Sequence, residues 1–257
     1  MLSRWLARLR PATAVAIDDA AWRSLLASSA LFARILPADL AVLRALAGRF
    51  LARKRFSGAA GHVLDDGQRL AIAALACLPV RRLGFDWLAG WREVIVYPGE
   101  FRVRREHHDE HTGVVTEGAD DLIGEAWERG PLILSWADVV TDLGHPFDGF
   151  NVVVHEIAHK LDMLDGAMNG VPRLPPGLAR REWIRTMQAG YDRLARAVER
   201  SRRTFIDPYA AESAEEYFAV VSELHVSDPA GLARAEPAVA ALLARLFDGA
   251  DAHGRKE

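Results

Sequence analysis

The segment NVVVHEIAHKLDMLDG, residues 151–166, predicts a helix that belongs to the core and also carries polar chemistry. Apolar side chains stand at 153, 154, 157, 158, 161 and 164, the spacing of a helix with a buried face. Gly166 is suited to end this helix because glycine adopts left-handed backbone conformations without strain. The histidines within the segment are therefore expected to lie in a core-forming element.

His155 and His159 stand four positions apart, so a helix places both imidazoles on one face, where they can bind the same metal ion. Glu156 lies about 100° round from His155, which suits a general base acting on a water molecule better than a third ligand. This HExxH pattern predicts one zinc ion per chain and a hydrolytic role. The alternative is a pair of histidines satisfied by protein neighbours without a metal.

A catalytic zinc needs a third protein ligand, and the downstream segment DPYAAESAEEYFAVVSELH, residues 207–225, offers several carboxylates. The spacing leaves four candidates open: Glu212, Glu215, Glu216 and Glu223. Ser213 and Glu216 also fit a helix capping box, which is a structural alternative for Glu216. A purely structural zinc would need a fourth ligand such as cysteine, and Cys77 lies in a different predicted helix.

The segments NVVVHEIAHKLDM and YAAESAEEYFAVVSE resemble the Mlc titration factor family of zinc metallopeptidases, whose zincin-like core is similar to that of anthrax lethal factor. The likeness extends to LACLPVRRLGFDWL, GEAW and GPLILSW, at 75–88, 124–127 and 130–136. The resemblance implies that Glu216 is the third zinc ligand. It also implies that Tyr209 lies over the metal and donates its hydroxyl to the developing oxyanion. Where the family's helix opens with Asn-Pro, this chain has Ser213-Ala214.

The resemblance implies an aminopeptidase-like activity on short peptides. The predicted strand PLILSW could bind the substrate backbone by edge pairing, because peptides commonly add to an exposed strand. It also implies an alternative function, a regulatory binding protein that sequesters the glucose repressor Mlc and so controls sugar-uptake genes. The first 60 residues match the family less clearly, so a partner-binding role carried there stays open.

The whole chain predicts an α+β fold that is predominantly helical, with a small, mostly antiparallel sheet and an N-terminal helical region. Helices are expected at 19–30, 38–53, 66–78, 151–166, 179–200, 213–225 and 235–247. Short strands are expected in VIVY, FRVRRE, TGVVTE and PLILSW, at 94–97, 101–106, 112–117 and 131–136. Three parts are predicted: a basic region 1–60, a metallopeptidase core 61–248 and a flexible tail 249–257.

Residues 1–60 carry ten Arg or Lys against three Asp, within a chain whose net charge is −3. Such a region can attract an acidic partner, nucleic acid or an anionic membrane, or it can be the solvated face of core helices. Neither direct nucleic-acid binding nor a membrane partner is expected. The lone Cys77 and the lack of an export signal favour the cytoplasm.

Two further polar features lie outside the predicted zinc ligands and catalytic residues. Asp162 either orients one of the imidazoles or forms a surface salt bridge. The run EHHDEH, with His107, His108 and His111, is read as a polar loop, with adventitious metal binding as the alternative.

Overall fold

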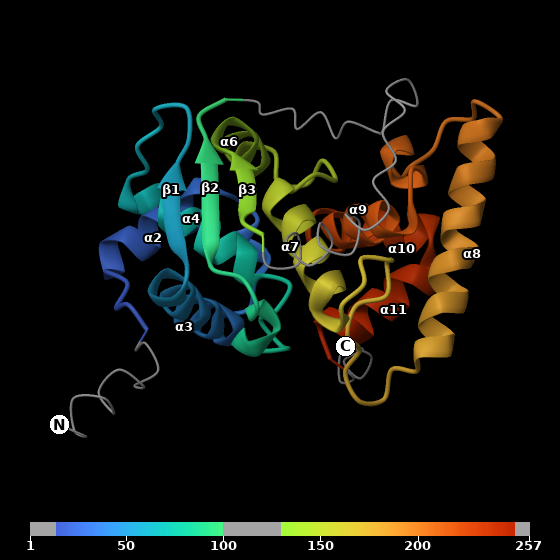
Figure 1. The fold of residues 1–257 in the computed structure, drawn as a ribbon, viewed down its shortest axis with the longest axis horizontal. Coiled ribbons are helices and arrows are strands. Elements are labelled where there is room, and N and C mark those ends of the chain that lie inside the picture. The colour runs from blue at the N-terminus through green and yellow to red at the C-terminus, as the bar shows by residue number, and fades with distance from the viewer. Residues whose placement is uncertain (1–13, 100–129, 250–257) are drawn as a thin grey trace, which may run out of the picture.

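The computed structural model describes residues 14–99 and 130–249, which form a mostly helical fold around one small sheet (Figure 1). The longer helices are α2 (Asp19–Ser28), α3 (Pro37–Arg53), α4 (Asp66–Cys77), α6 (Trp136–Gly144), α7 (Val152–Asp162), α8 (Arg180–Glu199), α9 (Ala214–Ser227), α10 (Pro229–Ala235) and α11 (Pro237–Phe247). Short 3-10 turns lie at Phe32–Arg34, Phe85–Leu88, Met163–Asp165 and Pro208–Ala211. None of the described helices is both long and apolar enough to cross a membrane.

In the part of the chain that is described, the sheet has the strand order β1 (Arg55–Gly58), β2 (Glu93–Tyr97) and β3 (Leu132–Ser135). Both pairs of neighbouring strands are parallel. The predicted antiparallel arrangement is therefore wrong for these strands. For β1 and β2 the reason is that α4 and the turns around it form a helical crossover, which lets the chain return to the start of the sheet and run in the same direction.

The strand β1 was not expected, because its four residues RFSG are mostly exposed and lack the alternation of apolar residues that marks a half-buried strand. The helix α6 was also not expected, since its nine residues follow β3 directly; Ser135 caps it by accepting a hydrogen bond from the Asp138 N–H at 3.2 Å. The helix predicted at 235–247 corresponds to α11, with α10 directly before it.

The helix α7 lies centrally, with the sheet on one side and the C-terminal helices on the other (Figure 1). It packs on α9, α4 and β3, and its residues Val153, Ile157 and Leu161 belong to a buried cluster that runs from Trp22 to Phe247. Asn151 caps it by accepting a hydrogen bond from the Val154 N–H at 3.0 Å. After a 3-10 turn the chain leaves at Gly166, with a left-handed φ of 99°, as the sequence predicted.

The helix α9 lies against α7 (Figure 1), and most of its residues are buried. Every residue from Glu216 to Leu224 is buried, including two glutamates. Ser213 caps the helix through the Glu216 N–H, at 3.3 Å. The contact between α7 and α9 therefore brings the HExxH segment against the acidic segment that follows it by about sixty residues in sequence.

Residues 1–13, 100–129 and 250–257 lie outside the description, and with them the predicted strands at 101–106 and 112–117, GEAW, the EHHDEH run and nearly all of the tail. The proposed division into a region 1–60 and a core 61–248 stays a prediction. Core residues Trp22, Phe32, Leu43 and Phe50 come from the first of these parts and pack in the common cluster.

Candidate metal centre

Three of the predicted site residues lie together: His155 and His159 on α7, and Glu216 in the first turn of α9. The two Nε2 atoms are 3.1 Å apart. The Glu216 Oε2 atom lies 3.1 Å from Nε2 of His155 and 3.4 Å from Nε2 of His159. Within the described residues these groups form a cluster whose potential ligand atoms all lie within 4.8 Å of one another.

The spacing of these atoms suits a small cation bound tetrahedrally. Ligand atoms about 2.0–2.1 Å from one zinc ion lie roughly 3.3 Å from each other at tetrahedral angles. The three separations of 3.1, 3.1 and 3.4 Å fall around that value. Two imidazole nitrogens and a carboxylate oxygen are also a donor set that zinc prefers. Glu216 is only 4% exposed, and a buried carboxylate is stabilised by a nearby positive charge.

Glu223 contacts His155 at Nδ1, the ring nitrogen that does not face Glu216. Its Oε1 atom lies 2.7 Å from Nδ1 of His155, and its Oε2 atom accepts a hydrogen bond from the Asn151 N–H at 2.6 Å. A carboxylate at Nδ1 keeps the proton on that nitrogen, so Nε2 carries the lone pair that points at Glu216 and His159. Glu223 was weighed as a third ligand from spacing; its position instead assigns it to orienting His155.

A second buried carboxylate, Asp142, supports the start of α7. It accepts a hydrogen bond from the Val152 N–H at 2.7 Å. Burial raises the pKa of Asp142 to about 7, with a smaller contribution from the charge of Glu223 and against the lowering effect of the Val152 N–H. Two acids on α6 and α9 thus fix the first residues of the helix that carries His155, where the positive end of the helix dipole favours them.

Asp162 is fully buried, so the predicted surface salt bridge is wrong. Its Oδ2 atom accepts a hydrogen bond from the Gly170 N–H at 2.6 Å, which ties the loop after α7 to the helix end. Burial raises the pKa of Asp162 to about 7, although hydrogen bonds from the backbone of 169–171 lower it. Asp162 therefore fixes the loop that follows α7. The carboxylate that contacts an imidazole of the cluster at Nδ1 is Glu223.

Tyr209 lies beside the cluster, in the 3-10 turn Pro208–Ala211. Its ring centroid is 6.3 Å from that of His155, and its side chain is half-buried. Asp207 fixes the turn by accepting a hydrogen bond from the Tyr209 N–H at 2.8 Å. Tyr209 and Glu156 stay predictions as catalytic groups. Glu156 is half-buried one residue after His155, and its charge raises the pKa of Lys160 against a larger lowering by burial.

The sequence matches the profile of a known family, the glucose-regulated metallo-peptidase M90 family, over residues 3–248. The chain belongs to this family. It is 39% identical over 195 residues to Mlc titration factor A of Escherichia fergusonii, covering 73% of this chain and 70% of that protein. It is 36% identical over 227 residues to Mlc titration factor A of Salmonella agona, covering 86% and 83%. An uncharacterized protein of Synechocystis sp. is 40% identical over 205 residues, covering 79% and 74%.

Family membership confirms the resemblance seen in the sequence, and the M90 family is a family of metallopeptidases. Membership implies a metal cofactor, and the His155, His159 and Glu216 cluster is a site where the chain could hold one. The residues that the sequence singled out separately thus meet at one place in the fold.

Proposed function

We propose that this chain is a zinc-dependent peptidase with a zincin-like core and aminopeptidase-like specificity. The observation that carries the proposal is the convergence of Nε2 of His155, Nε2 of His159 and Oε2 of Glu216 at 3.1–3.4 Å. Membership of a metallopeptidase family supports the same reaction class. The metal would be held by these three side chains, with the remaining position left for water and substrate.

A zinc ion supplies Lewis-acid polarisation of the peptide carbonyl and makes a water molecule more acidic. Glu156 accepts a proton from the attacking water and passes it to the leaving amine, which is general acid and base catalysis by one carboxylate. The Tyr209 hydroxyl donates a hydrogen bond to the carbonyl oxygen as negative charge develops there. Glu223 keeps His155 in the tautomer that leaves Nε2 unprotonated.

The strand β3 is the proposed platform for the substrate backbone. It is the end strand of the three described strands, and it packs on α7, which carries His155 and Glu156. Lys160 anchors the start of this strand to α7, because its Nζ donates to the Gly130 carbonyl at 3.1 Å. A peptide that pairs with β3 would therefore run close to the proposed catalytic groups.

The test compares wild type with Glu156→Gln for bound zinc and for hydrolysis of short peptides. We expect near-equal zinc content and a turnover lowered by ~10²–10⁴-fold, because the amide keeps the shape and cannot accept the proton. Glu199→Gln, at the exposed end of α8, is the matched control and should behave as wild type. Equal turnover in wild type and Glu156→Gln would reject the mechanism.

The aminopeptidase preference is tested separately with pairs of peptides that differ only in acetylation of the first amine. An aminopeptidase-like site should cleave the free peptide and lose most of its rate on the acetylated one. Equal rates on both would reject this preference and leave an endopeptidase.

A second candidate function is supported by the names of the relatives: two of them are Mlc titration factors. We propose that this chain also binds a glucose-type transcriptional repressor, and that the basic N-terminal region contributes to the contact. The exposed arginines Arg23 on α2 and Arg53 at the end of α3 are suitable probes of that surface.

Binding of a purified Mlc-type repressor should weaken at high salt and in the double variant Arg23→Glu, Arg53→Glu, since surface charges are screened by salt. Arg185→Glu, exposed on α8, is the control. Glu156→Gln should bind as wild type, which separates this function from hydrolysis. Affinity unchanged by salt and by the double charge reversal would remove the basic region from the contact. Deleting residues 1–60 is no test, because it removes core residues such as Phe50.

A further inference from the structure

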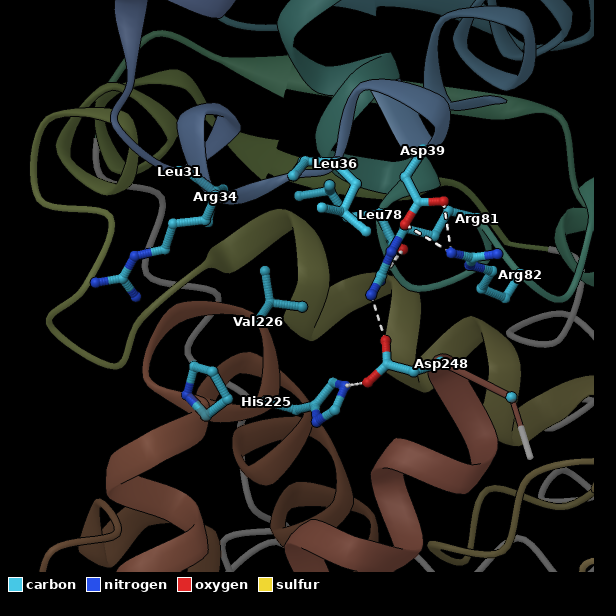
Figure 2. A pocket seen from close by; sticks show the side chains of 13 residues that line it. Leu31, Arg34, Leu36, Asp39, Leu78, Arg81, Arg82, His225, Val226 and Asp248 are labelled. Atoms are coloured by element: carbon cyan, nitrogen blue, oxygen red, sulfur yellow. Dashed lines mark hydrogen bonds and ion pairs between the residues drawn. The ribbon is translucent and has the colours of Figure 1, made fainter. Parts of the chain in front are cut away.

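A cavity of about 640 Å³ lies away from the metal centre, between the segment before α3, the turns after α4 and the ends of α9 and α11 (Figure 2). None of its lining residues belongs to the His155, His159 and Glu216 cluster. His225 lines it from the last turn of α9, nine residues after Glu216 and thus about 14 Å further along the helix axis. The volume is in the range of small-molecule sites, about 300–1,000 Å³.

The acids in this cavity are already paired with cations. Asp248 forms ion pairs with Arg81 and with His225, and Asp39 pairs with Arg82 (Figure 2). Burial alone would raise the pKa of Asp248, but the hydrogen bond from His225 and the charges of His225 and Arg81 outweigh it and hold the pKa below its usual value. Both aspartates are therefore engaged by arginines within the cavity.

Arg34 adds a positive charge that these acids do not match. Among the described residues no carboxylate lies within ion-pair distance of its guanidinium, which instead stacks 3.4 Å from the centre of the Phe147 ring. In the view of Figure 2, Arg34 and the Arg81–Asp248 pair stand on opposite sides of the cavity, with Leu36 and Val226 between them. The cavity thus has an excess of positive charge at its rim and apolar side chains across its floor.

We propose that this cavity binds a small organic anion, whose phosphate or carboxylate group meets Arg34 and whose body lies over Leu36 and Val226. A guanidinium presents a planar set of N–H donors that matches both anionic groups, and a ring-stacked arginine keeps its N–H edge available to a ligand. A cation is disfavoured because both aspartates are engaged by arginines. The apolar floor, including the 56% exposed Leu36, favours an organic body over a bare inorganic ion.

The test measures binding to the full chain by calorimetry, with phenyl phosphate, benzoate, inorganic phosphate and the uncharged benzamide as probes. We expect phenyl phosphate or benzoate to bind at least about tenfold more tightly than benzamide and inorganic phosphate, and more weakly as salt is added. The comparison of phenyl phosphate with benzoate tells which anionic group the cavity prefers. Equal binding of benzamide and the better organic anion, or no binding of either organic anion at low salt, overturns the proposal.

Two pairs of variants place the binding in this cavity. Arg34→Gln should lower the affinity for the better-binding anion about tenfold or more. Arg200→Gln, at an exposed position after α8, should leave that affinity unchanged. Leu36→Glu places a negative charge on the exposed part of the apolar floor and should abolish binding, while the uncharged Leu36→Gln should retain most of the affinity. Thermal melts check that each variant is folded. Full affinity in both Arg34→Gln and Leu36→Glu would place the anion elsewhere, including the metal centre, and overturn the proposal.

Discussion

The two ends of α9 use the same kinds of residue for opposite purposes. Near its first turn, Glu216 meets two imidazoles whose Nε2 atoms also face each other, so a carboxylate oxygen and two ring nitrogens converge. In its last turn, His225 lies 3.1 Å from Asp248, which is also paired with Arg81. The first arrangement is one that a cation would complete, as the proposed function requires, and the second already contains the cation Arg81. A histidine beside an acid therefore makes a candidate metal centre only where several potential ligand atoms converge and no side-chain cation is already present.

The largest expected effect comes from removing one imidazole at each end. His159→Ala should lower the bound zinc from about one ion per chain to nearly none, because two protein ligands hold zinc poorly. His225→Ala should keep its zinc and change only stability. Metal analysis after dialysis, with a melt of each protein, measures both effects. Stoichiometric zinc in His159→Ala, or zinc loss in a folded His225→Ala, would contradict the distinction.

Tyr209→Phe should lower kcat by ~10²–10³-fold with zinc content and KM close to wild type, since the hydroxyl would act only as charge develops on the carbonyl oxygen. Its ring near His155 stays in place in the variant. Tyr191→Phe is the matched control, because that hydroxyl donates to the Ala211 carbonyl at 3.1 Å, next to the same turn. If both variants keep full kcat, Tyr209 has a structural role.

Glu223→Gln should weaken zinc binding by ~10–100-fold, as expected when the partner of a ligating histidine is altered. The amide has one oxygen for two donors, so it either loses the Asn151 N–H or turns its NH₂ toward Nδ1 of His155 and favours the wrong tautomer. Asp142→Asn, which alters the other acid at the start of α7 without touching His155, should keep its zinc affinity. Competition with a chelator measures the affinity, and ¹⁵N shifts of the metal-free protein report the tautomer.

Equal zinc affinities in Glu223→Gln and Asp142→Asn would return Glu223 to a purely structural role. Glu223→Asp, which keeps the charge but is one methylene shorter, is expected between wild type and Glu223→Gln.

The last comparison concerns how buried acids titrate. The pKa of Asp162 is raised from 3.8 to about 7, so the folded state keeps a proton that the unfolded state loses, and stability falls as pH rises through this window. The free energy of unfolding of Asp162→Asn should therefore rise relative to that of wild type as pH increases, by at most about 1.4 kcal/mol per pH unit between about pH 4 and pH 7. The lowered pKa of Asp248 has the opposite sign, so Asp248→Asn should be less stable than wild type at neutral pH.

Denaturant unfolding of the chelator-treated proteins at pH 5 and pH 8 measures these differences. The contribution of Asp248 is present above the usual pKa of an aspartate and is lost as pH falls through its lowered folded value. A stability difference between Asp162→Asn and wild type that is the same at both pH values would contradict the raised pKa.

The sequence predicted the helix at 151–166 and its histidine pair because both depend on spacing within one helix. It could not choose among Glu212, Glu215, Glu216 and Glu223, since the choice depends on how α9 packs on α7; the family resemblance supplied Glu216. It also missed that Glu223 faces Nδ1 of His155, a contact across 68 residues.

The sheet was predicted less well than the helices. The segment VIVY has the apolar character of a strand, and β2 forms there. The direction of pairing depends on the neighbour, and β1 has only four residues, mostly exposed. Without β1, the parallel connection through α4 could not be recognised. The anion cavity left no local signal either, because its residues come from four separate segments.

The burial of α9 from Glu216 to Leu224 bears on which parts of the chain unfold locally. Local fluctuation seldom unwinds a helix segment whose residues are all buried, so we expect the amide hydrogens of this segment to exchange slowly with solvent. Exposed segments such as 200–203 can fluctuate without disturbing it. We therefore expect Glu216 to keep its position relative to α7 while such segments move, and slow hydrogen exchange along α9 would show it.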